Sequence, residues 1–294
     1  MTNQPARAVA RALEPFAGQV YFAPECHERY QALGFGPSPG DGNGVQLPNG
    51  PAYFCSRGSV MGQVSGEVVA AAFGVFNPAA VVPAVSEGWT LTDADTICAA
   101  RTAGAVDQLR RILGESPDGL DEIVAVLRRA TDGLPVAGNP LYAGLVAQDR
   151  PNDPLGEAWW LTDQLREFRG DVHVNAWTIA GFDAAEIGLL TELYWGLPPR
   201  SYVRTRAWTN ADLDAAQERL ESRGMLREGA LTADGRAARE NVEVLTDQGC
   251  ERIVSGLGDG LDTFVSVVGD WSRRVRAADG YPSGPKDVAP RSAN

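Results

Sequence analysis

Two histidines, His27 and His173, are the side chains of this chain whose ordinary pKa lies closest to neutrality. His173 follows Asp171 by two residues and precedes Trp177 by four. If Gly170 ends one helix and Asp171 caps the next, His173 and Trp177 lie on one helical face. The spacing predicts an imidazole beside an aromatic wall, either as a hydrogen-bonded core side chain or as a group that works in a pocket. His27 is expected to be exposed on a short polar helix.

Two arginines supply the charge that a catalytic histidine would need. Arg57 lies among small and aromatic residues, where its planar fork can pair with a carboxylate or an enolate, or form a structural salt bridge. Arg169 lies four residues before His173. One hypothesis is an enzyme that acts on a small apolar or aromatic metabolite, with His173 as general acid or base and Asp171 orienting it. Arg57 or Arg169 would then stabilise developing negative charge.

Aromatic residues suggest a second function, the binding of a small molecule. Phe73 and Phe76 fall on one stripe of a helix expected over 65–76, which is typical of a core face as well as of a ligand wall. An apolar pocket between helical layers would be lined by side chains of this kind together with one arginine. The predicted ligand-binding set is Tyr53, Phe73, Phe76, Trp89, Arg169 and Trp177.

Composition narrows the classes of partner. The 294 residues carry a formal net charge of -12, which disfavours nucleic acid and anionic membranes and favours a soluble monomer or a small oligomer such as a homodimer. The four cysteines form no Cys-x-x-Cys pair, so we expect reduced thiols, no metal site and no cofactor. Without a signal peptide pattern or a long apolar run, the chain is expected to be cytoplasmic and not to span a membrane.

The elements that must position these residues are mainly helical. Apolar periodicity predicts helices over 93–113, 120–130 and 155–168, and a capping box at Asp183 and Glu186 starts another that ends near Gly196. Proline and glycine between 133 and 154 suggest a division near residue 150. We expect a helical domain over 1–150, a helical and winged-helix-like domain over 151–278, and a disordered tail over 279–294.

The segment 187–248 resembles the winged-helix module of MarR-type regulators. The matching runs are Arg219–Leu226, at the end of the recognition-type helix, and Leu231–Arg236, just after a small β wing. The whole chain is similar to an uncharacterised actinobacterial family with a helical N-terminal half and a degenerate helix-turn-helix C-terminal half. The segments that carry this likeness are Tyr21–Glu25, Tyr53–Arg57 and Arg169–His173. The resemblance implies a fold and brings no activity with it.

The charge on the recognition-type helix departs from that of a DNA reader. Its polar positions are mostly acidic, whereas a helix in the major groove needs positive or neutral side chains. These positions are Asp212, Asp214, Glu218 and Glu221, against Arg219 and Arg223. We therefore expect a small-molecule sensor, carrier or sequestering protein that does not bind DNA, with the enzyme as the alternative and a MarR-like transcription regulator third.

Overall fold

The computed structural model describes residues 4–284, and in this range the chain forms fourteen α-helices and two small antiparallel hairpins. The first part consists of α1 (Pro5–Gly18), α2 (Pro24–Ala32), α3 (Gly50–Gly58), α4 (Gly66–Phe73), α5 (Pro78–Gly88), α6 (Ala94–Leu113), α7 (Leu120–Thr131), α8 (Pro140–Val146) and α9 (Pro154–Ile179). The second part consists of α10 (Ala184–Tyr194), α11 (Asn210–Ser222), α12 (Ala233–Gly249), α13 (Glu251–Leu257) and α14 (Leu261–Ala277). The prediction of a mainly helical chain is confirmed.

Short elements connect the helices. Four 3-10 turns are η1 (Gln19–Tyr21), η2 (Ser59–Met61), η3 (Val203–Arg206) and η4 (Gly258–Gly260). One hairpin pairs β1 (Asp41–Gly42) with β2 (Val45–Gln46). The other pairs β3 (Leu226–Arg227) with β4 (Ala230–Leu231), as predicted for the wing.

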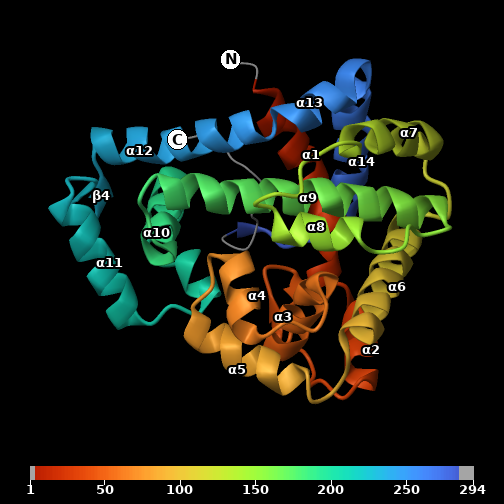
Figure 1. Cartoon of the computed structure of the whole chain (residues 1–294), viewed down its shortest axis with the longest axis horizontal. Coiled ribbons are helices and arrows are strands. Elements are labelled where there is room, and N and C mark those ends of the chain that lie inside the picture. Colours follow the sequence, from red (N-terminus) through yellow and green to blue (C-terminus); the bar gives the residue numbers. More distant parts are fainter. Residues whose placement is uncertain (1–3, 285–294) are drawn as a thin grey trace.

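Helix α9 is the central element of the molecule. Its 26 residues begin after Asp153, whose carboxylate accepts a hydrogen bond from the amide of Gly156. Figure 1 shows α9 crossing the middle of the molecule between α12 on one side and α8 on the other. The predicted break at Gly170 and Asp171 is therefore wrong, since both residues lie inside this helix. An interior glycine costs a helix only about 1 kcal/mol relative to alanine, and packing on several sides outweighs that cost.

A large hydrophobic core joins the N-terminal helices to the last ones. It extends from Ala6 to Tyr281, because α1 packs along α14 and α7 packs on α13. Phe16 and Trp271, whose ring centroids lie 5.3 Å apart, form part of this contact and are almost fully buried. The core thus includes residues from both sides of the division predicted near residue 150. The buried Trp159 is one of those that follow this division in the sequence.

A second core belongs to the winged-helix-like module formed by α10, α11, the β3–β4 hairpin and α12. Apolar side chains at helical spacing fill it, including Ile187, Leu190, Leu213, Leu220 and Val242. Its helices begin at side-chain caps, which are the capping boxes of Asp183 and Thr209 and the hydroxyl of Thr232. The module occupies one end of the molecule (Figure 1).

Two local predictions require correction. His27 is buried rather than exposed, because its ring nitrogens lie 3.0 Å from the carbonyl oxygen of Tyr21 and 3.2 Å from Gln46 Oε1. Within the predicted tail, Tyr281 is buried and donates a hydrogen bond of 3.0 Å to Glu14. Residues 285–294 of that tail lie outside the described residues. None of the helices in residues 4–284 combines the length and apolarity needed to cross a bilayer.

Candidate functional site

Two adjoining cavities lie where the helical part of the chain meets the winged-helix-like module. The first, of about 150 Å³, has walls from α1, α9, α10 and α12. The second, of about 260 Å³, lies between α1, α3 and the end of the described chain. Glu14, Arg166 and Arg206 line both. Together the cavities reach the size range of small-molecule sites, roughly 300–1,000 Å³.

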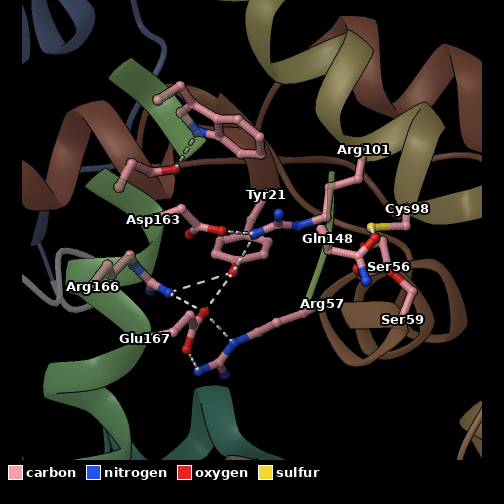
Figure 2. A network of polar contacts seen from close by, with 12 residues as sticks. Tyr21, Ser56, Arg57, Ser59, Cys98, Arg101, Gln148, Asp163, Arg166 and Glu167 are labelled. Atoms are coloured by element: carbon pink, nitrogen blue, oxygen red, sulfur yellow. Dashed lines mark hydrogen bonds and ion pairs between the residues drawn. The ribbon is translucent and has the colours of Figure 1, made fainter. Parts of the chain in front are cut away.

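The floor of the first cavity is a buried network of charges (Figure 2). Arg57 makes two hydrogen bonds, of 2.9 and 2.7 Å, to the carboxylate of Glu167. Arg166 lies 2.8 Å from Glu167 and 3.1 Å from Glu14, and the hydroxyl of Tyr21 donates to Glu167 over 3.1 Å. Burial raises the pKa of Glu167, but the neighbouring Arg57 and Arg166 outweigh it and bring the pKa down to about 2. Glu167 is therefore ionised, and Arg57 is already paired.

A second charge pair lies deeper in the same network. Arg101 of α6 contacts Asp163 of α9 at 2.8 Å, and both side chains are almost fully buried. Figure 2 shows the guanidinium of Arg101 between Asp163 and Tyr21, whose hydroxyl accepts from it over 3.4 Å. This network holds α1, α3, α6 and α9 in fixed positions, because breaking a buried pair leaves an uncompensated charge.

The wall contributed by α12 carries its own charges. Glu243 accepts hydrogen bonds from Arg239 at 2.7 Å and Arg169 at 3.1 Å. Burial opposes ionisation of Glu243, yet the two guanidinium groups hold its pKa well below the ordinary value. Arg239 also donates to the hydroxyl of Thr191, 3.0 Å away on α10. This cluster links α9, α10 and α12 around the first cavity.

His173 lies in the same wall and hydrogen-bonds to the module. Its Nδ1 lies 2.9 Å from the hydroxyl of Thr246, which itself donates to the carbonyl of Val242. The hydroxyl must therefore accept from the ring, so we assign the proton to Nδ1 and leave Nε2 as an acceptor. Burial lowers the pKa of His173 from its ordinary 6.5 to about 3, although Glu243 opposes the shift. The imidazole is neutral at pH 7.

Three arginine N–H groups of the first cavity are buried and have no hydrogen-bond partner among the described residues. They are Nε of Arg169, Nε of Arg206 and Nη1 of Arg239. Arg206 lies over the rings of Phe76 and Tyr202, each 4.9 Å from its guanidinium carbon. Donors left unsatisfied in this way are costly, about 1–3 kcal/mol each, so these groups favour acceptor oxygens beside them, supplied by water or by a bound molecule.

Five of the nine predicted site residues line these cavities. Arg57, Arg169 and His173 line the first, and Tyr53 and Phe76 line the second. The ring centroids of Tyr53 and Phe76 lie 5.6 Å apart. Phe54, which was not predicted as a site residue, completes this aromatic wall, with its ring centroid 5.3 Å from that of Tyr53 and 5.2 Å from that of Phe76.

The other four predicted residues lie elsewhere. Phe73 packs behind the aromatic wall, under the guanidinium of Arg57 at 4.3 Å. Trp89 donates to the carbonyl of Val64, and Trp177 is buried in the core of the module. Asp171 accepts a hydrogen bond of 3.0 Å from the amide of Tyr142 on α8, and thus does not contact His173. The proposed orientation of His173 by Asp171 is not formed.

Several charged residues that the cavity walls bring together were not predicted from the sequence. They are Glu14, Arg166, Glu167, Arg206, Arg239 and Glu243. One available signal was the spacing of Asp163, Arg166 and Glu167, which places Arg166 three residues after one carboxylate and sets the two carboxylates four residues apart on one face of α9. The remaining partners come from helices distant in sequence and leave no local pattern.

The outer face of the module confirms the charge pattern expected for α11. Glu218 and Glu221 are exposed, and Asp214 is paired with Arg200 at 2.6 Å. Arg219 is bound to Asp183 and Glu186. The basic side chains of this helix are thus committed to carboxylates, while acidic ones face outward.

Comparisons with known proteins identify a family for this chain. A family profile described as a helix-turn-helix family matches residues 6–282. No curated protein and no solved structure matches the chain. The chain belongs to this helix-turn-helix family.

Proposed function

We propose that this member of the helix-turn-helix family is a small-molecule-binding protein, acting as a sensor, carrier or sequestering protein. Its ligand would occupy the two cavities between the helical part and the module. The observation that carries the proposal is the set of three unpartnered arginine N–H groups beside an aromatic wall. A concave site with apolar walls and a few convergent polar groups is the usual form of a small-molecule site.

The proposal includes a MarR-like winged helix, over 187–248, that does not bind DNA. DNA binding requires cationic side chains that replace counterions on phosphates, and each exposed carboxylate adds repulsion instead. The acidic face of α11, with Glu218 and Glu221 exposed, supports this part of the proposal. A transcription regulator that reads DNA through this helix is therefore the less supported alternative.

An enzyme based on His173 has weaker support. A general base works best when its pKa lies near the working pH, whereas burial lowers the pKa of His173 to about 3. Its intended partner Asp171 is hydrogen-bonded to the amide of Tyr142 instead. Binding therefore accounts for the site better than acid–base catalysis.

A cavity-filling substitution tests the binding function. Gly170 lies on α9 in the wall of the first cavity, and an added Cβ would meet only Glu167, at an ordinary 3.6 Å. Gly170→Leu should therefore fold while filling the cavity. The matched control is Gly269→Leu on α14, where an added Cβ meets only the flexible end of Arg273 at 3.9 Å.

The measurement is the melting temperature, followed by tryptophan fluorescence, with a panel of aromatic acids, amides and hydrocarbons. Bound ligand stabilises the folded chain by about 2.7 kcal/mol at a hundredfold excess over Kd. At least one compound should stabilise the native chain and Gly269→Leu but not Gly170→Leu. No stabilisation by any compound, or equal stabilisation of Gly170→Leu, would contradict ligand binding. Fluorescence anisotropy with a random duplex at low salt should show no micromolar binding.

A further inference from the structure

We propose that the ligand is an aromatic carboxylate, with its ring in the second cavity and its carboxylate in the first, on Arg206. This inference rests on the proposed function and adds the chemical class of the ligand. The two cavities differ in their side chains: eight of the residues that line the first are arginine or glutamate, whereas six of those that line the second are tyrosine or phenylalanine. A molecule that fills both needs one apolar end and one polar end.

The charge balance of the first cavity favours an anion. Five arginines and three glutamates line it, and the neutral His173 adds no charge. The five arginines are Arg57, Arg166, Arg169, Arg206 and Arg239, and the three glutamates are Glu14, Glu167 and Glu243. Positive charge therefore exceeds negative charge by two, before any ligand is counted.

The excess charge has a definite location. Arg57 is paired with Glu167, and Arg166 is shared between Glu167 and Glu14. On the opposite wall, two arginines share the single carboxylate of Glu243. Arg206 has no carboxylate within ion-pair distance among residues 4–284, and its side chain makes only one long hydrogen bond, of 3.4 Å, to the hydroxyl of Tyr202.

The position of Arg206 connects this charge to the aromatic cavity. Its guanidinium lies over the ring of Phe76, which forms the wall of the second cavity with Tyr53 and Phe54. The two terminal Nη groups of an arginine match the two oxygens of a carboxylate in one plane. A carboxylate bound to Arg206 would therefore hold an attached ring against Phe76, where aromatic contacts add further stabilisation.

A carboxylate fits the walls better than a phosphate. Arg206 carries a single charge, and the second excess charge lies on the opposite wall, where Arg169 and Arg239 already share Glu243, so a singly charged group matches Arg206 better than a dianion on one phosphorus. The second cavity, of about 260 Å³, is larger than the roughly 150 Å³ that holds one benzene ring, so it has room for a fused ring system. Naphthoate is therefore a suitable probe, with naphthamide and naphthyl phosphate as its neutral and doubly charged counterparts.

The test compares the three probes on the full chain by isothermal titration calorimetry. Naphthoate should bind at least about tenfold more tightly than naphthamide, because only the acid places a charge on Arg206. Arg206→Gln should weaken naphthoate by about tenfold or more and change naphthamide by less than about twofold. The control is Arg204→Gln, which changes an exposed arginine of the same turn that is hydrogen-bonded to Asn210 and lines neither cavity.

Each other outcome overturns the inference. Equal affinity for the acid and the amide would exclude a carboxylate ligand while leaving the binding function intact. If naphthyl phosphate bound more tightly than naphthoate, the ligand class would be an aromatic phosphate and not an aromatic carboxylate. No binding of any probe at millimolar concentration would overturn the inference, whereas the proposed function is overturned only if the wider panel also fails to stabilise the native chain. Unchanged binding of naphthamide to Arg206→Gln shows that the variant is folded, so a loss confined to naphthoate cannot be attributed to unfolding.

Discussion

Replacing Asp171 by asparagine should stabilise the protein at alkaline pH and not at acidic pH. The side chain is buried, with one carboxylate oxygen accepting from the amide of Tyr142 and the other without a partner among the described residues. Burial raises the pKa of this carboxyl from its ordinary 3.8 to about 7. Above pH 7 the folded chain must therefore hold an uncompensated charge.

The sign of the effect follows from proton binding. Between pH 4 and 7 the folded chain binds the Asp171 proton more tightly than the unfolded chain does. The free energy of unfolding contributed by this residue is therefore fully present below about pH 4 and falls as the pH rises through 7. A pKa difference of about three corresponds to about 4 kcal/mol at pH 8.

The expected gain for Asp171→Asn is smaller than this limit. Asparagine keeps the acceptor for Tyr142 but places an amide donor where the unpartnered oxygen lies, at a cost of about 1–3 kcal/mol. We expect a gain of about 1–3 kcal/mol at pH 8 and none at pH 4.

Urea unfolding at both pH values measures the difference between the native chain and the variant. Asp121→Asn, which changes an exposed carboxylate in the first turn of α7, is the control and should change the free energy of unfolding by about 0.5 kcal/mol or less at either pH. A stability difference for Asp171→Asn that is the same at both pH values would refute the assigned pKa.

Three further substitutions test other contacts. Arg57→Ala should lower the free energy of unfolding by about 3 kcal/mol in urea titrations, because it leaves Glu167 with less compensating charge; a loss below about 1 kcal/mol would contradict a buried pair. The unfolded chain binds the His173 proton more tightly than the folded chain does, so this residue makes the free energy of unfolding rise between about pH 3 and 6.5. His173→Gln should remove that contribution to the rise; an unchanged pH profile would disprove this. Tyr281→Ala should cost about 3 kcal/mol, whereas Tyr281→Phe, which keeps the ring and loses the hydroxyl bond to Glu14, should cost about 1 kcal/mol; thermal unfolding of both separates packing from hydrogen bonding.

The module could be predicted from sequence because its signals are local. The capping box of Asp183, the cap at Thr232 and the glycine-containing turn between two short apolar runs each lie within a few residues of the element they define. The length of α9 could not be predicted, because a glycine such as Gly170 is typical of a helix end and only the surrounding helices show that α9 continues through it. Local propensity was outweighed there by tertiary contacts.

The site was predicted only in part for a similar reason. Residues two apart on a helix point about 200° apart, so one continuous helix separates the side chains of Asp171 and His173. The charge network depends on partners far apart in sequence, such as Arg166 and Glu14, which are separated by 152 positions. Such pairs have no signature in the sequence, whereas Tyr53 and Phe76 were found because residues of this type supply most of the apolar wall of a pocket.

The burial of Tyr281 also bears on how the protein is made. This residue closes a wall of the second cavity and bonds to Glu14 of the first helix, so the two ends of the described chain meet at the site. During synthesis, α1, α3 and α9 leave the ribosome long before Tyr281 does, because the chain emerges from its N-terminus. A nascent chain would hold the aromatic wall open to solvent, and the complete site can form only after translation has passed Tyr281.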